Sequence, residues 1–397
     1  MPKPIIGQRI RELRKPRFTQ HDLAAAADVS VDVIRKLEQG RRHTASIGTL
    51  QRIARALDVD VAELFGRSQT TQETDDDQSP VGAIRDALTS VDELLGELDD
   101  ADAPDLADLD RAVSYAWGTF FAGRYGPLAA LLPRLLADAQ AIVHAATAVE
   151  AGRAADLAAQ VHQIAAGTLV RLDAADLGHV AAREALRLAA STPDPLRAAS
   201  VYYIFGHVLM RQGRFIDAER VCVAAAEAVQ PIGRASTAQL GVYGGLLLRG
   251  ATAAARQRRT GAAADLLADA TAVAQRTGVD RTDFGVIFGP SNLIVQTADC
   301  RVVSENYVEA AEVARRMPRD SVLPLISRGR HLADVAHAEL RLGHTRAAES
   351  ALLTMERTAP EWTFHHQLPR VLVGELMTRG RPSTRLRELA HRLNTTC

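Results

Sequence analysis

The sequence predicts an all-α protein. Apolar residues recur three and four positions apart over most of the 397 residues, which is the spacing of one helix face. β-branched residues rarely alternate with polar ones, so strands are not expected. Short polar or glycine turns, such as those at Gly213 and Gly343, separate the helical segments.

A chain of this length is expected to form two or more domains. The tract 67–80 has no apolar side chain before its final proline and contains three consecutive aspartates, so it cannot cover a core. We interpret it as an acidic linker. The predicted order is a small first domain at 1–66, the linker at 67–80, an amphipathic helix with an acidic connector at 81–110, and a helical body at 111–397.

Charge is distributed unevenly along the chain. The net charge is −1, but residues 1–66 carry twelve basic and eight acidic residues, a balance of +4. Residues 67–110 carry two basic and fourteen acidic residues, a balance of −12. The basic character of the first domain is therefore hidden in the total, and a nucleic-acid partner is not excluded.

The segment 82–98 predicts one amphipathic helix. Its apolar stripe comprises Ile84, Leu88, Val91, Leu94, Leu95 and Leu98. Such a stripe must be covered, either by the body of the same chain or by a second subunit.

Several classes of protein are not favoured. No run of about 18 apolar residues occurs, which argues against a membrane protein, and the N-terminus lacks the pattern of an export signal, so we expect a cytoplasmic protein. Cys222, Cys300 and Cys397 are scattered, which favours reduced thiols over a zinc site or disulfides. His365 and His366 have no evident third ligand, so no metal or other cofactor is expected. No common catalytic motif occurs, which lowers the odds of an enzyme.

Residues 5–66 are expected to form five short helices. Thr19 is placed to cap the second helix, with Asp22 in the capping-box position. Asp28 is expected to adopt a left-handed backbone in the following turn. Ser30 is placed to cap the third helix, whose Ile34 would face inward.

This stretch closely resembles the phage-repressor/Cro type of helix-turn-helix, the XRE family. The matching residues are Thr19, Gln20, Leu23, Ala24, Val29, Ser30, Ile34, Glu38 and Gly40. Asp28 stands where glycine is usual, and Arg35 where a small hydroxyl residue is common. The resemblance implies that the third helix enters the major groove of a double-stranded DNA operator, and that a homodimer binds an inverted repeat.

The resemblance also implies the DNA-binding residues. They are Gln20, Ser30, Val31, Asp32, Arg35, Gln39, Arg41, Arg42, Thr44 and Ser46. Arg35 is the candidate for a bidentate contact to guanine. Asp32 either accepts from cytosine or only lies favourably at a helix N-terminus. The last four residues would bind phosphates.

Two further contacts in this domain have alternatives. Gln20 either contacts DNA or braces the third helix. Arg11 and Arg14 either bind phosphates or pair with Glu38, which we expect to be structural.

The body repeats a unit of two helices joined by a short turn. Besides Gly213 and Gly343, turns are expected near Arg124, Ala174, Thr260, Asn306 and Gly380. Small residues follow several of them, at Ala218, Ala263, Ala310 and Ala347. The turns lie farther apart than the roughly 34 residues of a tetratricopeptide repeat. We expect a tetratricopeptide-like α-solenoid with a concave surface; the alternative is an irregular helical bundle.

If the first helix of each pair lines the concavity, its polar residues should share a face. Four pairs of candidate ligand-binding residues have that spacing, namely Tyr203 and His207, Gln239 and Tyr243, Asn292 and Gln296, and Arg330 and Asp334. The segment 288–292 is a distinctive start to a helix. There, either Asn292 binds ligand or Ser291 or Asn292 only caps the helix.

A repressor-type head on such a body resembles the peptide- or small-ligand-responsive regulators of Gram-positive bacteria, most of all their actinobacterial relatives. The sequence thus predicts a sequence-specific DNA-binding transcription regulator, not an enzyme. Its body would dimerise and sense a peptide or a small molecule. The alternative is a protein-interaction scaffold with a weakly specific DNA-binding head.

Overall fold

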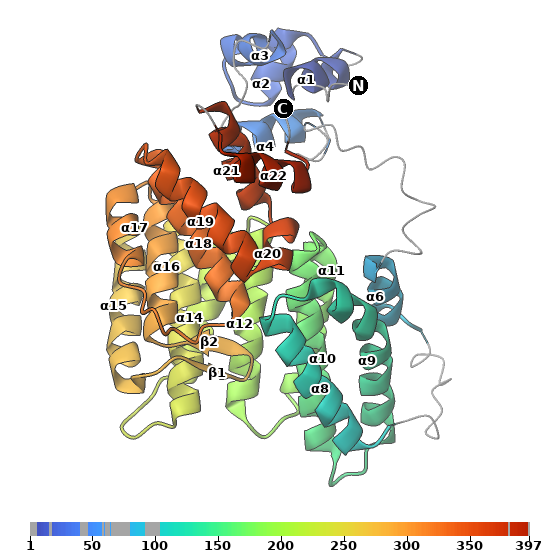
Figure 1. Cartoon of the computed structure of the whole chain (residues 1–397). Helices are drawn as coiled ribbons and strands as arrows, with labels where there is room; N and C mark the ends of the chain where they lie inside the picture. Colours follow the sequence, from blue (N-terminus) through green and yellow to red (C-terminus); the bar gives the residue numbers. More distant parts are fainter. Residues whose placement is uncertain are drawn as a thin grey trace. The chain divides into compact units, whose positions relative to one another are not determined.

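The computed structural model describes residues 6–15, 18–39, 47–57, 59, 64, 80–91, 104–379 and 382–395. The chain divides into two compact units, Met1–Ser79 and Pro80–Cys397, which we call the head and the body. Helices make up nearly all the regular structure of both units (Figure 1). The prediction of an all-α fold is confirmed.

The head contains four described helices around one small core. They are α1 (Ile6–Arg14), α2 (Gln20–Ala26), α3 (Val31–Glu38) and α4 (Ile47–Leu57). The core consists mainly of Ile10, Leu23, Ile34, Leu37 and Ile53, all with no exposed surface. The predicted fifth helix falls outside the described residues, apart from the buried Leu64.

Local interactions define the ends of α2 and α3 as the sequence predicts. Thr19 and Asp22 form a reciprocal capping box, and the Ser30 side chain accepts from the Val33 amide. Asp28 has a φ of 50° in the turn between the helices. Aspartate tolerates this left-handed conformation better than most residues, so the sequence forms the turn without glycine.

The first helix of the body, α6 (Pro80–Leu88), is shorter than predicted. It ends at Leu88, and Val91 is 51% exposed, so one continuous helix over 82–98 is wrong. The Thr89 hydroxyl bonds the Arg85 carbonyl, and such a side chain competes with helical hydrogen bonding. Ile84 is fully buried against the body of its own chain. Leu94, Leu95 and Leu98 lie outside the described residues.

The rest of the body is a series of helix pairs. They are α8 (Leu106–Phe121) with α9 (Tyr125–Ala145), α10 (Ala151–Arg171) with α11 (Ala175–Ala189), α12 (Pro195–Arg211) with α13 (Phe215–Ala228), α14 (Thr237–Arg256) with α15 (Thr260–Thr277), α16 (Pro290–Val303) with α17 (Tyr307–Ala314), α18 (Leu325–Arg341) with α19 (Thr345–Thr358), and α21 (Gln367–Thr378) with α22 (Thr384–Arg392). The short α20 (Pro360–His365) precedes the last pair.

One turn geometry recurs within these pairs. A residue with positive φ ends the first helix at Gly123, Asp173, Gly213, Arg258, Glu305 and Gly343. The next residue donates its amide to the carbonyl five positions back, as Arg214 does to Leu209 at 2.9 Å. This is the hydrogen bond of a Schellman-type cap. Six predicted turns are confirmed, and the one near Gly380 lies outside the described residues.

Small residues let the two helices of a pair approach closely. The residue five positions after the turn residue is small and buried in five pairs, at Gly178, Ala218, Ala263, Ala310 and Ala348. The prediction of Ala347 for the last of these is wrong by one position, because Ala347 is exposed.

The pairs form two layers. The first helices α10, α12, α14, α16 and α18 each contact the next first helix along the chain, with the second helices outside them (Figure 1). Both α10 and α14 are buried over most of their length. This stacking is the α-solenoid that the repeats predict, and an irregular bundle is not observed.

A β-hairpin interrupts the repeats and was not predicted. Strand β1 (Arg281–Asp283) pairs antiparallel with β2 (Val286–Phe288), and Phe284 and Gly285 form the turn with positive φ. Strands of three residues are too short to show a periodic pattern. The Phe288 ring is fully buried against Gly244 of α14, where a Cβ atom would lie 2.2 Å from the ring.

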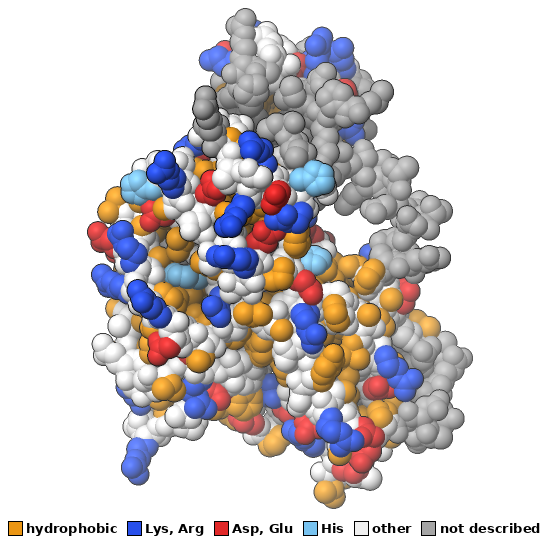
Figure 2. Space-filling view, viewed as in Figure 1, with side chains coloured by type: hydrophobic (Ala, Val, Ile, Leu, Met, Phe, Trp, Pro, Cys, Tyr) orange, Lys and Arg blue, Asp and Glu red, His pale blue; other side chains and the backbone are white. Residues whose placement is uncertain are grey.

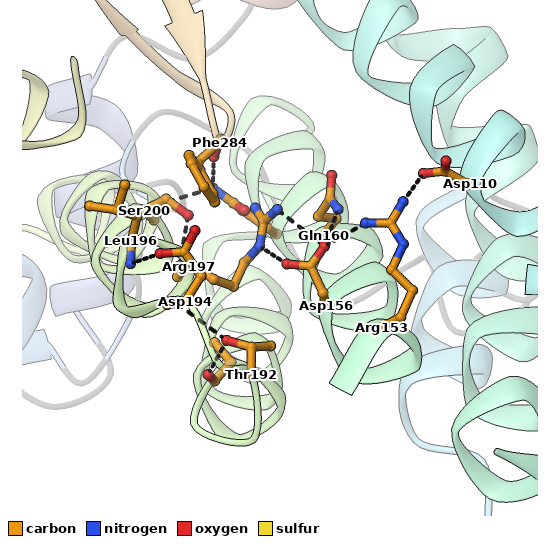
Figure 3. A network of polar contacts seen from close by, with 12 residues as sticks. Asp110, Arg153, Asp156, Gln160, Thr192, Asp194, Leu196, Arg197, Ser200 and Phe284 are labelled. Atoms are coloured by element: carbon orange, nitrogen blue, oxygen red, sulfur yellow. Dashed lines mark hydrogen bonds and ion pairs between the residues drawn. The ribbon is translucent and has the colours of Figure 1, made fainter. Parts of the chain in front are cut away.

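The tip of the hairpin is fixed to helices α10 and α12. Gln163 donates to the carbonyl oxygens of Phe284 and Ser200, both at 3.2 Å. The Arg197 guanidinium lies 4.8 Å from the Phe284 ring centroid and pairs with Asp156 at 2.6 Å (Figure 3). The hairpin therefore connects the middle of the solenoid to its beginning.

One described helix, α9, is long and apolar enough to cross a membrane by length and composition. Leu128, Leu132 and Leu136 of this helix are buried in the main core of the body. A core helix of this kind passes the same test.

Replacing Gly244 tests the packing of the hairpin. Gly244→Ala should lower the free energy of unfolding of the body by about 1–3 kcal/mol, because the new methyl group has no room beside Phe288. Gly118→Ala is the matched control, since nothing lies within 4 Å of its added Cβ. Urea titrations followed by tryptophan fluorescence would measure both, and equal midpoints for the two variants would contradict the packing described.

Candidate functional site

Helix α3 presents a polar face to solvent. Asp32, Arg35 and Gln39 are exposed, Val31 is half-buried, and Ser30 caps the helix. Asp32 pairs with Lys36 at 2.7 Å, with both side chains more than half exposed. A hydrogen bond from Lys36 lowers the pKa of Asp32, so the carboxylate is ionised and can accept hydrogen bonds. Three of the four residues predicted to face outward are thus exposed, whereas Val31 packs partly against the core of the head.

A buried carboxylate joins α3 to the first two helices. Arg14 donates to Glu38 from Nε at 2.6 Å and from Nη2 at 3.1 Å, and Gln20 donates to Glu38 at 2.8 Å. Burial by itself would raise the pKa of Glu38, but these hydrogen bonds outweigh it, and the pKa lies below the ordinary value. Of the alternatives for Gln20 and Arg14, the structure shows both bracing α3 through Glu38.

The remaining predicted DNA contacts, Arg41, Arg42, Thr44 and Ser46, lie outside the described residues, as does Gly40. Arg11 is exposed on α1.

The body contains a partly open cavity of about 300 Å³. Its walls come from α10, α12, α13, α14, β2, α16, α18 and the segment around α20. The predicted residues that line it are Tyr203, His207, Asn292, Gln296 and Arg330. First helices of the repeats therefore do bring predicted polar residues to one place.

Two predicted ligand residues lie elsewhere. Gln239 and Tyr243 are on the N-terminal half of α14, whereas the cavity is lined by Arg249, Thr252 and Arg256 from its C-terminal half. Gln239 instead donates to the Val229 carbonyl at 3.1 Å.

Asp334 lies behind the cavity wall. It is 1% exposed and accepts from Arg330 at 2.8 Å. It therefore holds a lining residue without lining the cavity itself.

Asn292 has a structural role that neither alternative anticipated. Its amide donates to the Ile287 carbonyl at 2.8 Å and so holds β2 against the start of α16. The cap residue is Gly289, without a side-chain cap, and the Asp280 carboxylate instead accepts from the Ser291 amide at 2.8 Å. The expectation that Ser291 or Asn292 caps α16 by its side chain is therefore wrong.

Sequence reasoning missed most of the cationic lining. Arg171, Arg211, Arg249 and Arg256 all face the cavity. A periodic signal was available for three of them, because Arg171, Arg211 and Arg256 each end a first helix, two positions before the turn residue. Arginine near a helix C-terminus is also favoured by the helix dipole, so this pattern by itself does not indicate a ligand site.

Four charged residues form a network on one wall. Arg256 binds Asp299 through two hydrogen bonds of 3.1 and 3.2 Å, and Arg330 bridges Asp299 and Asp334. Burial would raise the pKa of Asp299, but the two arginines hold it below the ordinary value. Burial raises the pKa of Asp334 to about 6.

His207 and His366, which line the cavity, are neutral at neutral pH. Burial and the nearby Arg249 and Arg171 hold the pKa of His207 well below its ordinary value. Burial and Arg171 lower the pKa of His366 to about 3. Among the residues that the structure describes, no three His, Cys, Asp or Glu side chains gather as metal ligands would.

Helices α2 and α3 form a capped helix-turn-helix, and the body is a tetratricopeptide-like solenoid around a cavity. This architecture defines a DNA-binding transcription regulator of the helix-turn-helix class. The helix-turn-helix family matches residues 10–64, so the head is a domain of this type.

Two wider comparisons add little. In the comparison with curated proteins, nothing matches the chain. Among solved structures, the chain is similar to Bacillus thuringiensis PlcR in complex with the peptide PapR7 and DNA. The identity is 11% and the TM-score 0.35, over 87% of this chain and 98% of that chain.

The Glu38 network predicts a pH-dependent contribution to the stability of the head. Glu38→Gln should cost about 1–3 kcal/mol at pH 7, because Arg14 loses a buried charged acceptor. Since the folded pKa of Glu38 is lowered, its stabilisation is present above the unfolded pKa and is lost as pH falls through the folded pKa. The difference between variant and parent should therefore shrink in acid.

Hydrogen exchange of α1–α3 amides in the full chain would measure this effect. Glu12→Gln is the matched control, because the pair of Glu12 with Arg9 is exposed. Both tryptophans, Trp117 and Trp362, lie in the body, so their fluorescence reports whether the body is unaffected. Equal protection in the two variants would show that Glu38 does not hold the head together.

Proposed function

We propose that the protein is a sequence-specific regulator whose α3 reads an operator in the major groove of double-stranded DNA. The observation that carries the proposal is the exposed face of α3, held in place from behind by Glu38 with Arg14 and Gln20. A recognition helix needs this combination of accessible polar side chains and a fixed orientation.

Arg35 is the best-placed side chain for base recognition. It lies on the exposed face of α3, and no carboxylate that the structure describes pairs with it. A free guanidinium can donate two parallel hydrogen bonds to guanine O6 and N7. Asp32, once released from the exposed Lys36 pair, would accept from cytosine N4, because such surface pairs contribute little energy.

The body supports a second part of the proposal, which is that it senses a peptide or a small molecule. The cavity lies where the first helices of successive repeats converge, so a ligand would contact several repeats at once. Its binding would change DNA affinity only if it favours one conformation over another. Because one head reads one half-site, we propose a homodimer in the cytoplasm that binds an inverted repeat. It would act by binding, without catalysis, cofactor or metal.

A protein-interaction scaffold with a weakly specific head is the second candidate. The observation that favours it is the extended helical-repeat surface, since solenoids commonly bind proteins. On the face visible in Figure 2, basic and acidic side chains of the body are interspersed, which does not favour a polyanion over other partners. Sequence-selective DNA binding would therefore depend on the head.

Gel-shift titration of the full chain on genomic fragments tests the proposal. A regulator should select particular fragments at physiological salt, whereas a scaffold would show only general, salt-sensitive binding. Arg35→Ala should weaken binding to a selected fragment by about 1–3 kcal/mol and relax the preference at one base pair.

Arg55→Ala is the control, because Arg55 is an exposed arginine near the end of α4, outside the recognition helix. Unchanged affinity and selectivity in Arg35→Ala would remove Arg35 from the interface. Binding to every fragment with equal affinity would favour the scaffold.

A further inference from the structure

The cavity in the body is lined by an excess of positive charge. Five arginines and one carboxylate line it, namely Arg171, Arg211, Arg249, Arg256, Arg330 and Asp299. His207 and His366, which also line it, add no charge at neutral pH because burial and nearby arginines lower their pKa values. Burying a guanidinium without a counter-charge is costly, so the partner of each arginine matters.

Three of the arginines have carboxylate partners within the protein. Arg256 and Arg330 share Asp299, and Arg330 also binds Asp334. Arg211 pairs with Asp173 at 2.7 Å. Each of these three arginines therefore has a carboxylate partner within the protein.

Arg249 has no such partner in the part of the chain that the structure describes. Its Nη1 lies 3.4 Å from Nδ1 of His207, and its guanidinium lies 4.3 Å from the Tyr203 ring centroid. Its Nε is buried without a hydrogen-bond partner. Because arginine can only donate, Nδ1 of the neutral His207 must accept, which leaves the proton on Nε2.

Arg171, which also lines the cavity, is in a similar situation. Its Nη1 donates to the Gly167 carbonyl at 2.8 Å, and its guanidinium lies 4.7 Å from the Phe120 ring centroid. Its Nε is also buried without a partner. No carboxylate among the described residues pairs with it, so two guanidinium groups at one cavity lack an anion.

The rest of the lining mixes apolar side chains with polar ones such as Thr252, Gln296, Ser327 and Gln367. Val170, Phe215, Ile287, Val295, Ile326 and Trp362 contribute to the walls. A volume of about 300 Å³ is at the lower end for small-molecule sites. Charge and shape together therefore fit a compact ligand with one anionic group and an apolar part.

We propose that the cavity binds a carboxylate-bearing ligand, with the carboxylate held by Arg249 and Arg171 and the apolar part against Ile326 and Trp362. This inference rests on the proposed sensing function and names the chemistry of its ligand. Arginine is well suited to the role, because its planar fork donates two parallel hydrogen bonds to a carboxylate. The carboxylate can belong to a small organic acid or to the C-terminus of a short peptide.

Isothermal titration of the full chain with matched acids and amides tests the proposal. The probes are octanoate against octanamide, and the dipeptide Ala-Phe against its C-terminal amide. At least one acid should bind, and at least about tenfold more tightly than its amide, because only the acid supplies the missing charge. Binding of octanoate alone would identify a small acid, and binding of the dipeptide alone a peptide terminus.

Arg249→Gln and Arg171→Gln should each weaken binding of the acid at least about tenfold and leave the weak amide binding unchanged. Arg220→Gln is the control, because Arg220 is 77% exposed on α13. Circular dichroism would check that the variants fold. If Arg249→Gln unfolds, Arg249→Lys takes its place as the test of the carboxylate contact, because lysine keeps the charge but lacks the planar guanidinium.

The proposal is overturned if neither acid binds, if amides bind as tightly as acids, or if folded variants of both arginines bind like the parent. Failure of the regulatory proposal gives a different result. An acid that binds as described but leaves operator affinity unchanged would remove the sensing role while keeping the carboxylate site.

Discussion

The recurring turn between paired helices is the constraint on which the body depends. In six pairs a left-handed residue ends the first helix, and the following amide closes a hydrogen bond five residues back. This geometry reverses the chain, and in five of the six pairs a small residue five positions later lets the second helix pack closely. Because the same turn recurs, the first helices stack in one layer.

The turn also explains why arginines converge. Arg171, Arg211 and Arg256 occupy the same position relative to their turns, so stacking of the repeats brings them to one end of the first-helix layer. An arginine that the helix dipole favours at each C-terminus thus becomes part of the positively charged wall of the cavity. Ile287 of the hairpin and Asn292, which donates to its carbonyl, line the same cavity.

In the head, one buried carboxylate fixes the orientation of α3. Glu38 is nearly fully buried, and its hydrogen bonds with Arg14 and Gln20 join α3 to the helices behind it. The charged contacts face inward, which leaves Arg35 and Asp32 on the outer face. The residue that fixes the orientation of α3 is therefore different from the residues on its exposed face.

The sequence by itself determined the features that depend on neighbours along the chain. Helix periodicity, the caps at Thr19 and Ser30 and the six body turns all follow from interactions within about five residues. The tertiary structure alone decided the packing of the hairpin, the displacement of Gln239 from the cavity and the pairing of the cavity arginines with carboxylates. These depend on residues tens of positions apart, such as Arg256 and Asp299, whose distance no local pattern contains.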